Sequence, residues 1–142
     1  MTELTLAKAN AIIATALELG AQKGFKPLGV AVLDAGGHLL AFQRQDGSPF
    51  IRAEVASGKA YGALAVGSSS RALGAAAVER PHFFQGLSAV SGGKIVPVPG
   101  GVLIRDRDGN VLGAVGISGD TSDNDELAAM AGIEAAGFVA KV

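Results

Sequence analysis

The chain has 142 residues, no cysteine, and 12 basic against 13 acidic residues, which leaves a net charge of −1. This balance argues against nucleic acid as the main partner, because no basic stripe is available to neutralise a run of phosphates. The absence of cysteine excludes disulfides, thiolate metal sites and a cysteine nucleophile. The length predicts one domain over residues 1–142, with enough chain to bury a core.

Hydrophobic residues make up 49% of the chain, aromatic residues only 5%, and there are 21 glycines. A small domain this apolar has difficulty covering its own surface, and exposed apolar patches usually mark interfaces, so we expect a homo-oligomer. Glycines and charges interrupt the apolar stretches, and the first residues lack the basic and apolar segments of a signal peptide. We therefore expect a cytoplasmic protein without a membrane partner.

The first part of the chain has the pattern of a helix followed by a hairpin. Apolar residues at steps of three and four predict a helix over residues 4–24. Strands are predicted over residues 28–33 and 38–44. The segment Asp34-Ala35-Gly36-Gly37 joins them as a turn, because its two glycines permit positive φ.

The middle of the chain is predicted to be mainly helical. A helix over residues 51–66 is rich in alanine and glycine, which favours close approach of a neighbouring backbone. The serines at 68–70 are candidate N-caps for a shorter helix over residues 71–78. Residues 82–93 have weak periodicity and are predicted as loop, and residues 94–97 as a short strand.

The last part combines a second hairpin with a final helix. Strands are predicted over residues 102–105 and 111–117, around the turn that contains Gly109. Asp123 is the expected cap of the final helix, with Glu126 reaching back three residues later. Its expected buried side consists of Leu127, Ala131, Ala135 and Phe138.

The order of these elements predicts the fold class. Hairpins separated by helices favour an α/β (α+β) domain with a mainly antiparallel sheet and helices packed on it. A dinucleotide-binding fold needs strands that alternate with crossover helices, and this alternation is missing from the pattern.

Both predicted hairpins carry motifs of a known family. The first motif is Val30-Ala31-Val32-Leu33-Asp34-Ala35-Gly36-Gly37-His38-Leu39, followed by Phe42-Gln43-Arg44 and Asp46-Gly47. The second is Pro99-Gly100-Gly101-Val102-Leu103-Ile104, then Gly109 and Gly113-Ala114-Val115-Gly116-Ile117-Ser118-Gly119. Matches continue at Ala56, Lys59, Ala60, Asp125-Glu126 and Ala131-Gly132.

With these motifs the chain resembles the GlcG/HbpS family over nearly its whole length. That family includes haem-binding and haem-degrading domains and the carboxy-terminal domain of PduO-type proteins. The resemblance implies a profilin-like fold with a five-stranded antiparallel sheet, and assembly as a tetramer to an octamer. The chain has Leu103 where the family often has proline, and it lacks the Glu-x-x-Glu pair linked to iron in secreted members.

The two histidines occupy different contexts. His38 follows the Gly-Gly turn, where a side chain satisfied by the backbone is favoured over a ligand role. His82 follows Pro81 and precedes two phenylalanines. It is a candidate haem axial ligand or general base, and packing at a subunit contact is the alternative. Two widely separated histidines and scattered acids do not predict a first-row metal site.

Four charged residues complete the candidate ligand-binding set. Lys59, in a helix of small residues, either extends to solvent or binds an anion such as a carboxylate or haem propionate. Arg44, at the end of a strand, is a surface charge or a second anion ligand. Asp125 and Glu126 complement the dipole of the last helix, and Glu126 is also a candidate proton carrier with His82.

Three functions remain open from the sequence. The resemblance favours an oligomeric protein that binds a small molecule, with haem or a related tetrapyrrole as the candidate cofactor. The second is a small cofactor-independent enzyme acting on a carboxylated or carbonyl metabolite. The third is a non-catalytic accessory subunit.

Overall fold

The computed structural model describes residues 3–142. Its centre is a five-stranded sheet in the order β2-β1-β4-β3-β5, in which every neighbouring pair is antiparallel. The strands are β1 (Gly29–Asp34), β2 (Leu39–Arg44), β3 (Gly101–Arg105), β4 (Val111–Ser118) and β5 (Val139–Lys141). The predicted antiparallel sheet flanked by helices is confirmed.

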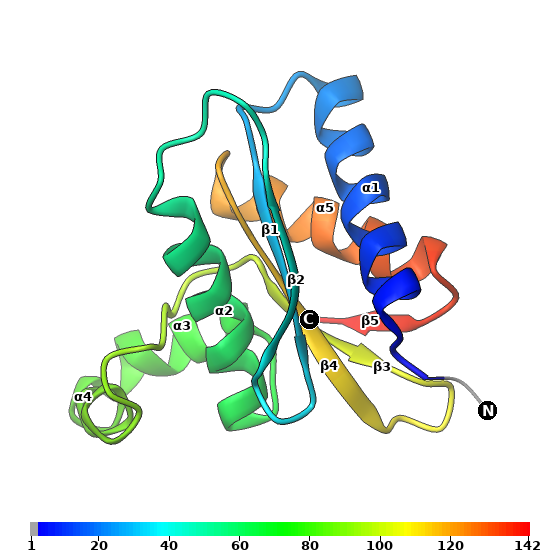
Figure 1. Cartoon of the computed structure of the whole chain (residues 1–142). Helices are drawn as coiled ribbons and strands as arrows, with labels where there is room; N and C mark the ends of the chain where they lie inside the picture. Colours follow the sequence, from blue (N-terminus) through cyan, green and yellow to red (C-terminus); the bar gives the residue numbers. More distant parts are fainter. Residues whose placement is uncertain (1–2) are drawn as a thin grey trace.

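Helices cover both faces of the sheet, as Figure 1 shows. One face packs against α1 (Leu6–Lys23) and α5 (Ser122–Ala135), and the other against α2 (Arg52–Val66). Two further helices, α3 (Ser70–Glu79) and α4 (Pro81–Val90), continue from α2. The sheet therefore has two separate buried layers.

Strand alternation sorts the apolar side chains between these layers, because successive residues of a strand point to opposite faces. Val30, Val115 and Ile117 lie in the larger cluster with α1 and α5. Leu33, Leu103 and Ala114 lie in the smaller cluster with Ala60 and Ala63 of α2. The central strands β1, β3 and β4 are therefore buried on both faces.

Helix α2 lies unusually close to the sheet. A Cβ atom at Gly116 would overlap the carbonyl oxygen of Ala56, and one at Gly101 would overlap that of Lys59. On another side of the helix, a Cβ at Gly62 would lie 2.9 Å from Ile95 Cγ2. The close approach predicted from the small residues of α2 is confirmed, and the glycines that permit it lie on both partners.

Side-chain caps explain where several helices begin. Ser69 accepts a hydrogen bond from Ala72 N at 3.2 Å at the start of α3, as the run of serines predicted. The prediction for α5 was wrong in detail, because Thr121 rather than Asp123 is its N-cap. The buried side of α5 also differs from the prediction. It contains Ala128, Ala129, Gly132 and Ile133, whereas Leu127 is 45% exposed. Phe138 is buried as predicted, but it lies beyond the end of α5.

Two further predictions were wrong. The loop predicted over residues 82–93 is mostly helix, because residues 81–90 form α4. Pro81 occupies the first turn of α4, where the missing N–H costs no helical hydrogen bond. Residues 94–97 are not a strand, and β5 after α5 is the fifth strand instead. In the first hairpin turn, only Gly37 adopts positive φ, at +82°.

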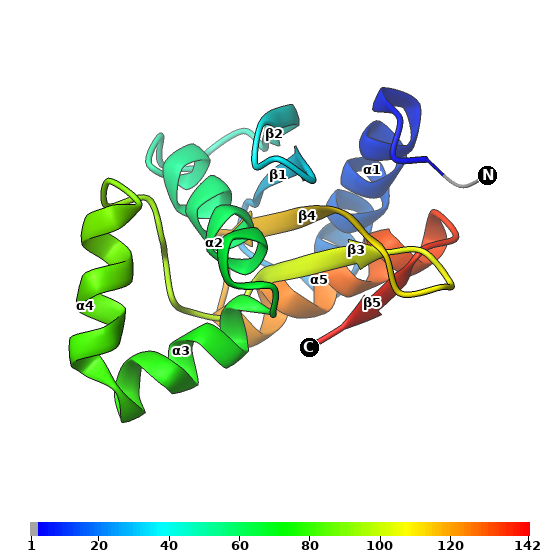
Figure 2. The ribbon, with the colours of Figure 1, turned by 90° about the horizontal axis from the view of Figure 1, so that it is seen from below.

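Helices α3 and α4 form an arm that extends away from the sheet (Figure 2). Helix α4 contains no buried residue, and its neighbour in the fold is α3. Phe83 is 49% exposed and Val90 is 85% exposed. A ten-residue helix is marginal in water without packing. The arm is therefore the part of the described chain that is held least by its own core.

Candidate functional site

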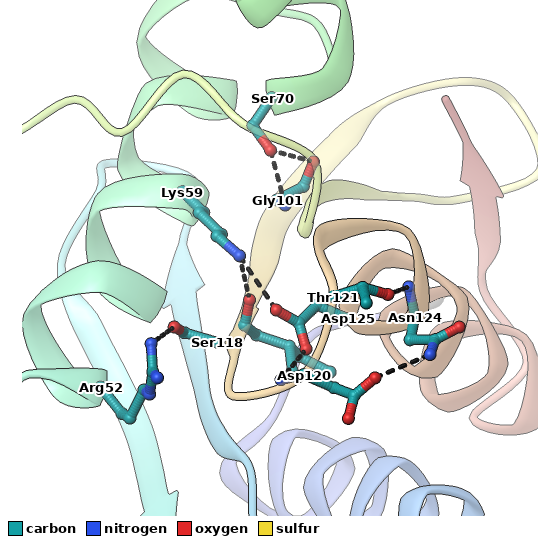
Figure 3. Close-up of polar contacts among 10 residues, drawn as sticks. Arg52, Lys59, Ser70, Gly101, Ser118, Asp120, Thr121, Asn124 and Asp125 are labelled. Atoms are coloured by element: carbon teal, nitrogen blue, oxygen red, sulfur yellow. Dashed lines mark hydrogen bonds and ion pairs between the residues drawn. The ribbon is translucent and has the colours of Figure 1, made fainter. Parts of the chain in front are cut away.

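Two of the predicted site residues, Lys59 and Asp125, meet in the interior (Figure 3). The Lys59 Nζ donates to Asp125 Oδ2 at 3.1 Å and to the carbonyl oxygen of Ile117 at 2.9 Å. The other carboxylate oxygen of Asp125 accepts from Asp120 N at 2.9 Å. Lys59 is 2% exposed and Asp125 is 1% exposed. The pair thus joins α2, the end of β4 and the start of α5.

Burial is the main influence on the ionisation of Lys59. Desolvation lowers the pKa of Lys59, while the charge and hydrogen bond of Asp125 oppose this shift and the nearby Arg52 adds to it. A buried charge is tolerated when an opposite charge and further hydrogen bonds satisfy it, and both conditions are met here. Lys59 is therefore not extended to solvent, and its charge is paired with Asp125, while its role as a ligand for an anion stays a prediction.

Further hydrogen bonds surround the Lys59–Asp125 pair. Arg52 Nη1 donates to Ser118 Oγ at 3.2 Å, and Gly101 N donates to Ser70 Oγ at 2.7 Å (Figure 3). Gly100 adopts φ +128°, and a Cβ there would lie 2.9 Å from Lys59 Nζ. The glycine-rich motif of the second hairpin thus makes room for the lysine side chain.

Glu126 lies near this region but has a different partner. Its carboxylate oxygens accept from Arg71 Nε, both at 3.1 Å, and Arg71 also bonds to Asp123. These hydrogen bonds raise the pKa of Arg71, with the bond to Asp123 as the largest cause. Arg71 was not a candidate from the sequence, although it immediately follows the capping serines. The arrangement ties α3 to α5.

The structure does not bring the other two predicted residues to this region. Arg44 ends β2 and lines a shallow hollow against α1, with Leu17 and Ala21 on its opposite wall. His82 is exposed in the first turn of α4, on the arm. The five predicted residues therefore do not converge on one pocket, and proton transfer between His82 and Glu126 stays a prediction.

A groove of about 540 Å³ lies on the opposite side of α2. We call it the α2 groove. Its floor is one stripe of α2, and its walls come from the first hairpin and from the segment after α4. It is lined by Leu33, Gly37, Leu39, Ile51, Glu54, Val55, Ser57, Gly58, Tyr61, Gly93, Lys94 and Val96. Small-molecule sites have this character, mostly apolar with a few polar groups, and volumes of about 300–1,000 Å³.

The polar groups of the α2 groove are few. They are Glu54, Ser57 and Tyr61 on α2, and Lys94 on the opposite wall. Lys94 Nζ lies 5.4 Å from the centroid of the Tyr61 ring, within the range of a cation–π contact. The groove therefore offers an apolar slot with a cation, a carboxylate and a phenol.

The sequence contained a signal for this groove that reasoning about charged residues missed. Ile51, Val55, Gly58 and Tyr61 follow one another at helical steps of three and four, so they share a face of α2. The wall that contains Lys94 had no comparable signal, because α4 and the following turn place it.

Two general features bear on the kind of site. Within residues 3–142, no three His, Asp or Glu side chains gather in a way that would hold a metal ion. No helix in that part of the chain is long and apolar enough to cross a membrane.

Known proteins share both the sequence pattern and the fold. The family model described as "Haem degrading protein HbpS-like" matches residues 4–134. A Citrobacter freundii protein, described as an uncharacterized 15.0 kDa protein in the dhaT-dhaS intergenic region, is 32% identical over 121 residues. That match covers 85% of this chain and 80% of the relative.

Among solved structures, a PduOC:heme complex superposes with a TM-score of 0.85 at 27% identity, covering 96% of this chain and 97% of that one. A double mutant of Streptomyces reticuli HbpS has a TM-score of 0.82 at 25% identity, covering 96% and 89%. The Klebsiella pneumoniae protein ORFY has a TM-score of 0.83 at 27% identity, covering 96% and 92%. The similarity thus extends over almost the whole chain in sequence and in fold.

Proposed function

The chain belongs to the HbpS-like family, as its hairpin motifs predicted, and from that premise we propose that it binds haem or a related tetrapyrrole in the α2 groove. The observation that carries the proposal is the groove itself, with its apolar lining and one cation opposite a phenol. A relative of the same fold was crystallised with haem. Haem-related binding is the activity that the family supports.

The residues of the groove fit such a ligand. A haem site requires an apolar slot for the ring, a donor for the iron and a cation for the propionates. Leu39, Ile51 and Val55 supply apolar walls, and Lys94 is exposed at the rim as the cation. Lys94 takes the role that the sequence suggested for Lys59, whose charge is already neutralised by Asp125.

A pair of leucines tests the position of the ligand. Leu39 is 61% exposed and lines the groove, whereas Leu127 is 45% exposed on α5, outside the groove. Replacing Leu39 with aspartate places a charge on the apolar wall and removes the apolar area that the ligand would cover. This is expected to weaken haem affinity by about tenfold or more, while Leu127→Asp leaves it unchanged.

The measurement is a haem titration followed by the Soret band, with the free ligand separated by gel filtration. Equal affinity in wild type, Leu39→Asp and Leu127→Asp would place the ligand outside the α2 groove. A wild-type protein that leaves haem unbound at micromolar concentration would defeat the proposed function itself.

We also propose that the protein is a homo-oligomer, a tetramer or larger, with the arm of α3 and α4 in a subunit interface. The support is the arm itself, where exposed side chains such as Val78, Phe83 and Val90 have no core to cover them. Exposed apolar clusters of this kind usually mark interfaces. Assembly would cover α4 and give it the packing that an isolated chain lacks.

Light scattering combined with gel filtration tests this assembly. Val90→Asp is expected to lower the molar mass of the particle, whereas Val142→Asp, at an exposed position outside the arm, leaves it unchanged. A wild-type protein that is monomeric at micromolar concentration would contradict the proposal. An oligomer whose molar mass is unaffected by Val90→Asp would show that the interface does not include α4.

A further inference from the structure

The α2 groove contains few side chains that can bind the iron of a haem. We propose that Tyr61 binds the iron of the tetrapyrrole through its phenolic oxygen. The inference rests on the proposed function, because it requires the ligand to lie in this groove. It goes further by assigning the metal contact to one side chain of the groove.

The lining of the groove contains one side chain of a type that holds haem iron. Protein side chains that hold haem iron are those of histidine, cysteine, methionine and tyrosine. Tyr61 is the one residue of these types among the lining residues of the described chain. It is also the single tyrosine in the sequence. An iron held inside this groove therefore has Tyr61 as its candidate ligand.

The two histidines of the chain are placed less favourably. His82 lies on the arm and does not line the groove. His38 neighbours the groove in sequence, but its Nδ1 lies 3.2 Å from Asp34 Oδ1 and its side chain is 81% exposed. Neither imidazole is held against the apolar slot.

The Tyr61 ring both lines the groove and packs against the interior. The ring contacts the buried cluster that contains Leu33 and Leu103, and it belongs to a helix that is pressed onto the sheet. The first hairpin turn lies against the ring, because a Cβ at Gly37 would lie 3.5 Å from Tyr61 Cδ2, an ordinary contact distance. A half-buried phenol that is packed against the core and lines an apolar groove is suited to holding a metal centre in one orientation.

The charges around Tyr61 fit a bound phenolate. On binding, the phenol would release its proton to water, and its oxygen would replace a water molecule on ferric iron. The phenolate then balances part of the positive charge of the iron, and Lys94, the cation proposed for the propionates, lies 5.4 Å from the centroid of the same ring. An anionic oxygen donor favours ferric over ferrous iron, so reduction is expected to weaken the complex.

Tyr61→Phe tests this contact because it removes the hydroxyl and keeps the ring. Wild type, Tyr61→Phe and a histidine-free His38→Ala/His82→Ala variant are titrated with ferric haem and, separately, with iron-free protoporphyrin. The readouts are affinity, the visible absorption spectrum and the electron paramagnetic resonance signal of the ferric complex. Circular dichroism checks that all three proteins fold alike.

The expected result is specific to the iron. Tyr61→Phe loses the ferric phenolate spectrum and binds haem about tenfold more weakly or worse, while its affinity for protoporphyrin is unchanged. The histidine-free variant keeps the wild-type spectrum and affinity. Dithionite reduction releases haem from the wild type more readily than from a histidine-ligated protein such as myoglobin.

Three results would overturn the assignment while leaving haem binding intact. The first is a wild-type spectrum in Tyr61→Phe. The second is loss of that spectrum in the histidine-free variant, which identifies a histidine as the ligand. The third is an equal loss of haem and protoporphyrin affinity in Tyr61→Phe, which makes Tyr61 a wall of the groove. Failure of the wild type to bind either compound would instead defeat the proposed function.

Discussion

The two sides of α2 contrast most sharply at Lys59 and Tyr61, two residues apart. Lys59 points toward the sheet and is enclosed, with its ammonium group bonded to Asp125 and to the Ile117 carbonyl. Tyr61 points toward the α2 groove, where its ring is half-buried and Lys94 is its charged neighbour. Lys59 is enclosed on one face of the helix, where its charge is paired with Asp125, while the other face is open.

This difference shows where ligand chemistry is available. The charge of Lys59 is already balanced by Asp125, and exposing it to a ligand would break this buried pair at a cost of about 3–5 kcal/mol. A polar group on the open face requires no such disruption. Changes on the enclosed face should therefore alter stability, and changes on the open face should alter binding.

Replacing Lys59 with methionine should give the largest loss of stability. The substitution leaves Asp125 buried without its cation, so we expect the free energy of unfolding to fall by about 3–5 kcal/mol. Urea unfolding followed by circular dichroism measures the change. Asp125→Asn in the same chain removes the unpaired charge and should restore part of the loss.

The matched control for that experiment is Lys94→Met, on the open face. Its lysine is exposed and outside the buried pair, so the change in unfolding free energy should stay within about 0.5 kcal/mol. Equal losses of unfolding free energy for the two lysines would mean that the buried Lys59–Asp125 pair contributes no more to stability than the exposed Lys94.

Gly116→Ala should give the next largest effect. The added Cβ would overlap the Ala56 carbonyl oxygen and lie 2.9 Å from Ala60 N, so α2 must move away from β4. Overpacking of this kind costs about 1–3 kcal/mol. Gly86→Ala on the arm is the comparison, because a Cβ there meets nothing within 4 Å. It should stabilise α4 by up to about 1 kcal/mol, since alanine is the better helix former.

Acid should lower the stability of the protein by protonating Asp120, which lies in the loop between β4 and α5. Its carboxylate accepts hydrogen bonds from Asn124 Nδ2 at 2.7 Å and from Lys26 N at 2.8 Å, and these lower the pKa of Asp120 to about 2. Because the folded-state pKa lies below the ordinary value of 3.8, the contribution is complete above pH 3.8 and is lost as the pH falls toward 2.

The measurement compares the melting temperatures of wild type and Asp120→Ala between pH 6 and pH 2. The variant should melt lower at pH 6, and the difference should shrink as the solution becomes more acidic. Asp46→Ala, in another exposed loop, controls for the loss of an acidic side chain. A difference that stays constant down to pH 2 would contradict a role for the ionised carboxylate.

The smallest change in stability is expected on the open face. Leu39→Asp, the variant used for the haem titration, alters a side chain that is exposed in the chain alone, so the unfolding free energy should shift by about 0.5 kcal/mol or less. Urea unfolding without ligand measures this. A loss comparable to that of Lys59→Met would show that the groove wall is part of the core.

Much of the fold followed from local pattern. Helix and strand periodicity placed α1, α2 and both hairpins, because the repeat of buried apolar residues is a local property of each segment. The predictions were wrong where burial depends on distant segments. Residues 81–90 form a helix without a buried face of its own, and β5 exists because three residues after α5 pair with β3.

The candidate site was less predictable for the same physical reason. The sequence by itself determined the family, through the glycine motifs of the two hairpins, and it determined that the chain has two histidines, one tyrosine and no cysteine. Only the tertiary structure decided which charged side chains are available to bind a ligand. It paired Lys59 with Asp125 across 66 positions of the chain and brought Lys94 over Tyr61. Such pairings depend on how α2 packs against the sheet, and periodicity within one segment carries no information about the partner that faces it.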